Sequence, residues 1–413
     1  MDPYIEICVW RKNMKSILFV INTMGVGGGA KAILELFKQF DFSKYEVSLF
    51  VLTGQGELVT QIPPEVKLLN KKYFPISVLD KAGEMQLLKT VIKSMFTRGT
   101  FFKRIGYVLS NLLDMIKKSV IHKDKLCWKI LADGAPRMDR EYDLAVAYLE
   151  GGSAYYVASY VKAKKKAVFI HTNYELAGYT RKLDEDCYLI FDKIFAVSES
   201  VKKAFLSFYP ECRKRTSIFY NLLDKEEIIR KSKEPGGFTD CYDGLRILTV
   251  GRLVPEKAHD VEISAMKILK DSGKPFRWYV LGEGEMRKRL EDQIRRLGLE
   301  NDFILLGTVE NPFPYYFQCD LYVHAAYVEG KCIAIEEAQI LGCAMLVSDH
   351  AGIREQVDEG VDAEIFELDP NILAESILAF TEHPQKMKKY GCAAAERRQE
   401  NNQKEISKLL ELL

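Results

Sequence analysis

The chain has 413 residues, enough for roughly two to three domains that each bury a core of their own. Hydrophobic residues make up 47% and charged residues 28%, with 27 Gly and 13 Pro, which excludes a collagen-like, low-complexity or mostly disordered protein. The 59 Lys and Arg nearly balance the 58 Asp and Glu, so no overall charge attracts nucleic acid, and any basic surface must be local.

The cysteines and the N-terminal pattern predict a cytoplasmic location. The 9 cysteines are odd in number, with no C-x-x-C pair, which indicates reduced thiols. Basic residues before the apolar run 17–21 resemble an export signal, but Asp2 and Glu6 are acidic where such a signal is basic. No apolar run reaches the ~18 residues needed to span a bilayer. We therefore expect neither export nor a membrane-spanning segment.

Short runs rich in β-branched and aromatic residues alternate with helix-length segments along the chain. This alternation predicts a parallel sheet with crossover helices in each half. In the first half the predicted strands are 16–21, 46–52, 144–149, 167–170, 194–197 and 217–220, with helices such as 30–40 and 200–208. In the second half the strands are 246–250, 277–281, 303–306, 321–323, 344–347 and 364–366, with helices at 260–270, 286–297 and 330–341.

The repeated alternation of strands and helices predicts two doubly wound α/β domains. We place an extension at 1–14, the first domain at 15–221, a linker at 222–244, the second domain at 245–385 and a charged helical tail at 386–413. The linker contains KSKEPGGFTD, which is dense in Pro, Gly and charge. Because open parallel sheets bind ligands beyond the carboxyl ends of their strands, two such sheets facing each other would share one interdomain cleft.

A glycine-rich loop follows the first predicted strand, in the sequence INTMGVGGGAKAI. Glycines there let the backbone approach a phosphate, and the next helix start supplies free N–H groups. Two alternatives stay open, ligand contact by Gly27 and Gly28 or a tight structural turn. A nicotinamide dinucleotide site needs an acidic residue at the end of the second strand, where this chain has Leu52, Thr53 and Gly54. An oxidoreductase is therefore disfavoured.

Two motifs place charges after strands of the second domain. In TVGRLVPEKAHD, Arg252 and Lys257 could clamp a diphosphate, the alternative being an ordinary solvated pair. In YVEGKCIAIEEA, Glu329 would close a loop and a helix would begin at Gly330, whose free N–H groups favour an anion. Glu337 would lie two turns into that helix and suit the paired hydroxyls of a ribose, while Glu329 suits the hydroxyls of a sugar.

Four segments together resemble the family-4 retaining glycosyltransferases of GT-B architecture, in which two Rossmann-like domains face a cleft. They are GGGAK, GRLVPEK, the stretch from LGEGEMRKRL to NPFPYY, and EGKCIAIEEA. The resemblance covers about residues 15–382 and is strongest over 245–338. NPFPYYFQCDLYV followed by EGK further resembles bacterial enzymes that build capsular or surface polysaccharides.

The resemblance implies a role for each matched residue. The diphosphate would lie against the two cations and the glycine loop, the ribose against Glu337, and the transferred sugar against Glu329 and His171. The residues implied in donor binding are Gly27, Gly28, Arg252, Lys257, Gly330 and Glu337, and those implied in catalysis are Glu329, His171, Arg252 and Lys257.

Three positions depart from the family's pattern. Ala258 stands where Gly is usual, which would stiffen that turn, and Lys31 stands where Glu is frequent, so it receives no role. Lys331 replaces an apolar residue, which leaves open whether it touches phosphate or acceptor.

We expect no metal and no other cofactor, because the cations and helix N–H groups can stabilise the leaving diphosphate. Asp184 and Asp186 superficially offer metal carboxylates. They lie, however, on a predicted helix face whose apolar members pack inward, namely Leu183, Cys187, Leu189 and Ile190.

The segment 81–130 is a predicted helical insertion with a strong local charge. It holds eleven Lys or Arg against three acids, interleaved with aromatic residues such as Phe96, Phe102 and Trp128. Such a segment can rest on an anionic lipid surface. The alternative is a helical insertion whose apolar face packs on the first domain. No nucleic-acid motif accompanies the charge.

These expectations combine into one functional hypothesis. The chain would be a retaining, metal-independent glycosyltransferase that moves a hexose or N-acetylhexosamine from a nucleotide-sugar, with UDP as the first choice, to a glycan acceptor. The acceptor would be polyprenyl-linked, at the inner face of the cell membrane. The alternatives are a nucleotide-sugar epimerase of the same architecture and a non-catalytic partner subunit.

Overall fold

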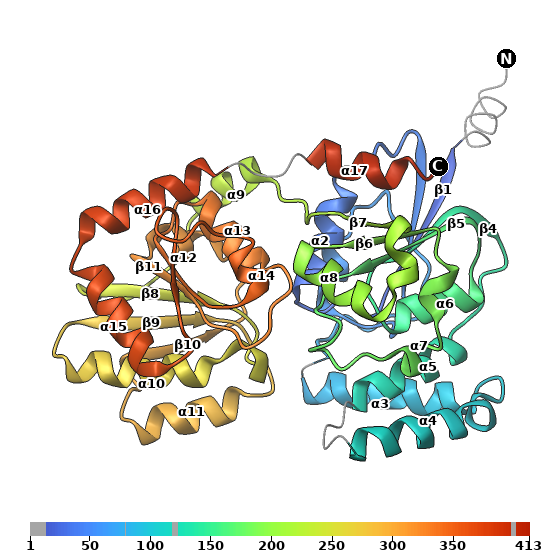
Figure 1. The fold of residues 1–413 in the computed structure, drawn as a ribbon, viewed down its shortest axis with the longest axis horizontal. Coiled ribbons are helices and arrows are strands. Elements are labelled where there is room, and N and C mark those ends of the chain that lie inside the picture. The colour runs from blue at the N-terminus through green and yellow to red at the C-terminus, as the bar shows by residue number, and fades with distance from the viewer. Residues whose placement is uncertain (1–13, 79, 118–122, 398–401) are drawn as a thin grey trace. The chain divides into compact units, whose positions relative to one another are not determined.

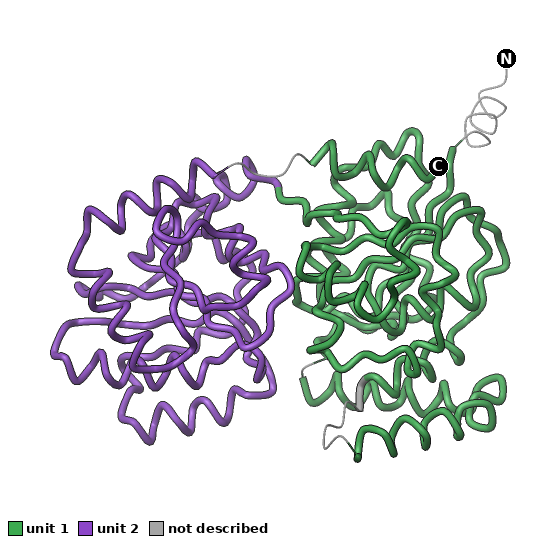
Figure 2. Tube along the Cα trace, viewed as in Figure 1, with its two compact units in different colours: residues 1–223, 400–413 green, residues 224–399 purple. Residues whose placement is uncertain are grey.

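The computed structural model describes residues 14–78, 80–117, 123–397 and 402–413 (Figure 1). The chain forms two compact units, one of residues 1–223 with 400–413 and the other of residues 224–399 (Figure 2). The predicted extension 1–14 lies outside the described residues except for Met14.

The first unit is built on a seven-stranded sheet of order β3-β2-β1-β4-β5-β6-β7, with every neighbouring pair parallel. The interior strand β1 (Lys15–Ile21) is buried from its second residue onward, as expected of a sheet covered on both faces. The other strands are β2 (Tyr45–Val51), β3 (Lys67–Leu68), β4 (Glu141–Ala147), β5 (Lys162–Ile170), β6 (Lys193–Ala196) and β7 (Thr216–Ile218).

The second unit repeats this plan with a six-stranded parallel sheet of order β10-β9-β8-β11-β12-β13. Each strand predicted from the sequence overlaps an observed one, and the prediction missed β3, which is only 2 residues long. The strands are β8 (Leu245–Val250), β9 (Phe276–Leu281), β10 (Phe303–Gly307), β11 (Leu321–His324), β12 (Met345–Ser348) and β13 (Glu364–Phe366).

Amphipathic helices pack on these sheets (Figure 1). In the second unit, for example, α10 (His259–Asp271) buries its apolar face in the core formed with β8 and β9. The helix predicted at 330–341 is shorter, because α13 runs from Ile333 to Ile340 and Cys332 before it is extended. The remaining helices of the two units include α2 (Gly28–Phe37), α6 (Gly152–Tyr160), α8 (Glu199–Phe208), α11 (Arg287–Arg296), α12 (Phe313–Gln318), α14 (Ala351–Arg354) and α15 (Pro370–Thr381).

The predicted insertion contains three helices, α3 (Lys81–Phe96), α4 (Thr100–Lys117) and α5 (Lys123–Gly134). They pack on one another, and α5 packs on α6. No helix in the described ranges is long and apolar enough to cross a membrane.

The unit boundaries differ from the predicted linker and tail. The predicted linker 222–244 includes α9 (Lys225–Ser232), which packs on α12 and α13 of the second unit. The predicted tail 386–413 is divided, since most of α16 (Pro384–Glu396) lies within it and belongs to the second unit, and α17 (Asn402–Leu410) to the first. The Glu405 carboxylate of α17 accepts the Tyr220 N–H at 2.9 Å, a tertiary contact that composition does not reveal.

The segment around Asp184 also differs from the prediction. Helix α7 (Arg181–Asp184) is a single turn, and it ends because Glu185 and Asp186 take the left-handed conformation, with φ of 47° and 54°. The predicted continuous helix face is therefore wrong. Of its four apolar members, two are buried and two exposed, with Leu183 and Cys187 inside and Leu189 and Ile190 outside.

Candidate active site

The second sheet brings three of the predicted site residues to one edge. Its strand order reverses between β8 and β11, the switch point at which open α/β sheets bind ligands. The loop after β8 carries Arg252 and Lys257, and the loop after β11 carries Glu329. The Tyr327 N–H donates to the Glu256 carbonyl at 2.8 Å and ties the two loops together.

Lys257 and Glu329 form a direct ion pair, with side chains only 16% and 14% exposed. Burial alone would lower the pKa of Lys257, but the Glu329 carboxylate outweighs it and raises that pKa above its ordinary value. Burial alone would raise the pKa of Glu329, but the Lys257 charge and a hydrogen bond from His324 hold it well below its usual range. Both groups therefore stay ionised at neutral pH.

His324, at the end of β11, orients the Glu329 carboxylate. Its Nε2 lies 3.2 Å from Glu329 Oε2, and its Nδ1 lies 3.2 Å from the Tyr322 hydroxyl. Burial, and then the nearby Lys257 charge, lower the pKa of His324, so the ring is neutral, donates through Nε2 and accepts through Nδ1. The sequence analysis missed this residue, although its place at a strand end, five residues before Glu329, was a usable signal.

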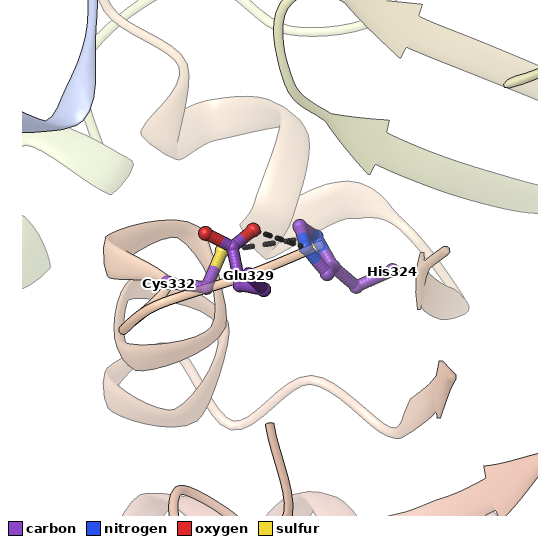
Figure 3. A group of neighbouring side chains, drawn as sticks. All are labelled: His324, Glu329 and Cys332. Atoms are coloured by element: carbon purple, nitrogen blue, oxygen red, sulfur yellow. Dashed lines mark hydrogen bonds and ion pairs between the residues drawn. The ribbon is translucent and has the colours of Figure 1, made fainter. Parts of the chain in front are cut away.

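His324, Glu329 and Cys332 also form a group whose ligand-capable atoms all lie within 4.8 Å of one another (Figure 3). Burial raises the pKa of the Cys332 thiol to about 12, and Lys257 already bonds the carboxylate. A metal ion would have to deprotonate that thiol and displace a lysine, so the donor set fits a metal poorly.

Arg252 is exposed, and its side chain has no partner within the part of the chain that the structure describes. The Arg252 backbone is held by His259, whose Nε2 lies 3.0 Å from the Arg252 carbonyl oxygen. His259 Nδ1 in turn lies 2.8 Å from the buried Glu262 carboxylate, which accepts the Thr249 hydroxyl at 3.1 Å. The loop is thus held rigidly while its cation stays available for an anion.

The two glycines of the LGEG motif pack against the backbone of the loop that carries Arg252. A Cβ on Gly282 would lie 1.8 Å from the Gly251 carbonyl oxygen, and a Cβ on Gly284 would lie 2.2 Å from that of Leu253. Glycine is required at both positions because the two backbones touch. The motif therefore shapes the Arg252 loop and needs no ligand to explain it.

Glu337 lies in α13 and is buried, with its Oε2 accepting the Tyr316 hydroxyl at 3.0 Å. Since the helix starts three residues later than predicted, Glu337 is just over one turn in, not two. Gly330 is buried in the loop before the helix. Lys331 forms an ion pair with Glu336 at 2.8 Å, so its charge is taken up within the unit.

Gly27 and Gly28 lie at the start of α2 in the first unit. Gly27 is extended with φ of −175°, and neither residue has a positive φ. A Cβ on Gly27 would meet only the Gly25 carbonyl at 4.0 Å, and one on Gly28 would meet nothing. In the described structure neither a positive φ nor a close contact requires glycine at these two positions. At Gly29, by contrast, a Cβ would lie 2.8 Å from the Leu149 side chain.

His171 follows β5, and its surroundings are those of a neutral ring. Burial lowers its pKa, although the Glu150 charge and a hydrogen bond to the Tyr148 carbonyl oppose that shift. Its Nε2 is buried without a hydrogen-bond partner among the described residues. The Glu150 carboxylate accepts the His171 N–H at 2.9 Å and the Thr172 hydroxyl at 2.7 Å. Glu150 is a second residue that the sequence analysis missed.

Comparison with known proteins identifies the second unit. Residues 241–397 match the model of the family described as Glycosyl transferases group 1. The match lies wholly within the second unit and confirms the predicted resemblance to glycosyltransferases there.

Two curated relatives match part of the chain. One is the N-acetylgalactosamine-N,N'-diacetylbacillosaminyl-diphospho-undecaprenol 4-alpha-N-acetylgalactosaminyltransferase of Campylobacter jejuni, 34% identical over 143 residues, or 34% of this chain and 37% of the relative. The other is the amylovoran biosynthesis glycosyltransferase AmsK of Erwinia amylovora, 29% identical over 151 residues, or 33% of this chain and 37% of the relative. The chain thus spans little more than a third of each relative's length.

A solved structure matches the whole fold. Anabaena Alr3699/HepE in complex with UDP and glucose superposes with a TM-score of 0.68 and 18% identity, over 96% of this chain and 98% of that one. The chain therefore has the predicted GT-B fold, with two Rossmann-like domains. Identity this low shows the fold, and the UDP and glucose are ligands of the Anabaena protein.

Proposed function

We propose that this protein is a retaining glycosyltransferase that transfers a hexose or N-acetylhexosamine from a UDP-sugar to a lipid-linked glycan during surface polysaccharide synthesis, without a metal. The observation that carries the proposal is the buried Lys257–Glu329 pair beside the unpartnered Arg252 at the switch point of the second sheet. The group 1 domain supports the reaction class, the UDP bound by the Anabaena protein supports the nucleotide, and the Campylobacter relative's substrate supports the lipid-linked acceptor.

The charges fit the departure of a diphosphate. Cleavage of the bond between the anomeric carbon and the diphosphate leaves negative charge on a phosphate oxygen. Arg252 and Lys257 supply two cations, of which Glu329 already balances one. Cations fixed in this way stabilise the developing charge without a metal. In a retaining transfer the acceptor hydroxyl attacks on the face that the diphosphate leaves, and its proton passes to the departing phosphate oxygen.

The unoccupied atoms of the two glutamates suit donor hydroxyls. Lys257 and His324 both bond Oε2 of Glu329, and Oε1 has no partner among the described residues. Oε2 of Glu337 accepts the Tyr316 hydroxyl, which leaves Oε1 for a ribose hydroxyl. We assign the transferred sugar to Glu329 and the ribose to Glu337 on this basis.

In the first unit, His171 and the start of α2 offer further groups for the donor. Nε2 of His171 is buried and has no partner among the described residues, so it can accept a sugar hydroxyl once the atoms that cover it move aside. The open space over Gly27 and Gly28 lets a phosphate approach their N–H groups.

Steady-state kinetics with a panel of UDP-, GDP- and ADP-sugars test the site. Glu337→Ala should raise the KM for the donor about a hundredfold, whereas Tyr316→Phe, which leaves the carboxylate in place, should change it by less than about fivefold. Glu329→Gln should lower kcat about a hundredfold or more at nearly constant KM. Unchanged kinetics in both glutamate variants would refute the assignment.

The two alternatives have distinct signatures. A nucleotide-sugar epimerase would convert the donor to an isomer without any acceptor, and NMR of the incubated donor would show the new anomeric signal. A non-catalytic subunit would bind no nucleoside diphosphate in calorimetry. Transfer of labelled sugar only when a lipid-linked glycan is present supports the proposed reaction against both.

A further inference from the structure

Helix α4 is packed with its apolar side outward. Its exposed apolar residues recur every three or four positions and form one stripe. An apolar stripe of this kind is normally buried in a soluble protein. Where such a stripe is exposed, it marks an interaction surface. The stripe consists of Phe102, Ile105, Leu109, Leu113 and Ile116, which are 83%, 48%, 54%, 57% and 53% exposed.

Polar groups hold the opposite side of α4 to its unit. Arg104 donates to Asp133 at 2.6 Å and to Glu185 at 2.9 Å. The Tyr107 hydroxyl donates to the Leu183 carbonyl at 2.8 Å. These contacts, with the buried Met115, fix which face of the helix points inward. The outward stripe is thus the orientation that the packing selects.

Helix α3 continues the same surface. Four of its apolar residues also recur at helical spacing and are exposed, namely Met85, Leu88, Ile92 and Phe96 at 60%, 58%, 46% and 76%. The Phe96 ring stacks on Phe101 at 6.3 Å, and Phe101 meets Phe102 edge-on at 5.5 Å. The two stripes therefore join at the turn between the helices, and we call these nine residues with Phe101 the α3–α4 stripe.

The charge beside the stripe is basic. Residues 81–117 hold seven Lys and Arg against two acids, whereas the rest of the chain holds 52 against 56. Lys89, Lys93 and Lys103 are exposed, and their ammonium groups have no partner in the described structure. Of the two acids, Asp114 is paired with Lys182 at 2.5 Å. The local excess of positive charge is therefore available to an anionic partner.

We infer that the α3–α4 stripe docks this protein on an anionic lipid bilayer, with the apolar side chains in the headgroup–acyl boundary and the lysines on lipid phosphates. Apolar residues flanked by lysine are the features by which interfacial helices bind such membranes. A second copy of the chain fits less well, because two surfaces of like charge would be brought together. This inference does not rest on the proposed function, since the stripe and its charges are independent of the second unit's chemistry.

Vesicle co-sedimentation of the full chain tests the inference, with no nucleotide-sugar present. In about 0.15 M salt the wild type should bind vesicles with about 30% phosphatidylglycerol about a hundredfold or more better than phosphatidylcholine alone. The variant Phe102→Gln, Leu109→Gln, Leu113→Gln should lose about tenfold or more on anionic vesicles. Lys89→Gln, Lys93→Gln, Lys103→Gln should lose about a hundredfold there and little on neutral vesicles.

A matched control uses equally exposed apolar residues outside the stripe. Phe317 and Val361 are 60% and 52% exposed, and Phe317→Gln with Val361→Gln should bind as the wild type does. As a local probe, Trp at position 102 (Phe102→Trp) should show blue-shifted emission on anionic vesicles, and Phe317→Trp should not. Circular dichroism and Tm close to the wild type establish that the variants are folded.

Three results would overturn the inference. The first is equal binding of the wild type to neutral and anionic vesicles, and the second is undiminished binding of the stripe variant. The third is a wild-type dimer in analytical ultracentrifugation that the stripe variant does not form. The last result would assign the stripe to a second copy. Loss of vesicle binding with intact sugar transfer in detergent would support membrane docking and leave the proposed activity standing.

Discussion

The two sheets share one parallel plan, but the glutamate near the switch point of each sheet has different partners. At the first, between β1 and β4, the buried Glu150 carboxylate accepts a backbone N–H and a hydroxyl. At the second, between β8 and β11, Glu329 faces Lys257 and a neutral histidine. The comparison teaches that the fold supplies the position and the loops supply the charge.

Removal of Lys257 should have the largest effect on this contrast. Lys257→Ala takes a cation from the diphosphate and leaves Glu329 buried without its counter-ion. We expect a loss of about 10² to 10³ in kcat/KM and destabilisation of roughly 3–5 kcal/mol. Donor kinetics and denaturant unfolding measure the two effects.

A double variant separates the two effects. Lys257→Met with Glu329→Gln removes both charges and should recover much of the stability but none of the activity. A double variant as unstable as Lys257→Ala alone would show that the ion pair is not the source of the stability loss.

The second prediction sharpens the comparison through a buried carboxyl of the first unit. Asp184 receives the Tyr155 and Tyr209 hydroxyls at 2.8 and 3.2 Å instead of a lysine, and burial raises its pKa from 3.8 to about 7. The folded protein thus holds a proton that the unfolded chain releases, and stability should fall as pH rises from about 4 to 7. The contribution is on the order of a few kcal/mol. Glu329 acts in the opposite sense, because its depressed pKa stabilises the fold above its ordinary range and is lost in acid.

Thermal unfolding across pH tests this assignment. Asp184→Asn should flatten the decline of Tm between pH 4 and 7. The parallel variant Glu329→Gln should leave that decline in place. An unchanged slope in Asp184→Asn would mean that other groups cause the pH dependence.

The third prediction concerns the helix start of the first unit. Gly28→Ala places a methyl group in open space, so the fold should be unharmed or stabilised by up to about 1 kcal/mol. If a phosphate approaches this backbone, the Kd for the donor should rise about tenfold. Gly106, also helical with open space around its Cβ, offers the control. Gly106→Ala should leave the Kd for the donor unchanged, and equal affinity in both variants would remove Gly28 from the site.

The smallest expected effect is at Ala258, in the loop that carries Arg252 and Lys257. Ala258 has φ of 46°, a conformation that costs a residue with a Cβ roughly 1 kcal/mol. Its methyl group is fully buried, however, which returns about 0.8 kcal/mol. Ala258→Gly should therefore shift Tm by less than about 2 °C. A rise of several degrees would show that the turn is strained in this protein.

The sequence by itself determined every strand except β3, the parallel arrangement of the two sheets and the edge at which Arg252, Lys257 and Glu329 meet. These features follow from local signals, because the spacing of apolar residues, the ends of strands and the spacing of glycines can each be recognised within a few residues. Sequence could also have identified His324, which ends a strand beside the predicted loop. Glu150 and Tyr316 were out of reach, since their contacts come from segments far apart in the chain.

Only the tertiary structure decided which face of an amphipathic segment is buried and which is exposed. The sequence of α4 shows an amphipathic helix but not which side is covered, and the bonds of Arg104 and Tyr107 turn its apolar side outward. The division of the tail between two units and the pairing of Lys331 with Glu336 were decided in the same way. The physical reason is that the amphipathicity and charge of a segment show what it can bury or pair with. Which partner it meets is decided only when the whole chain packs.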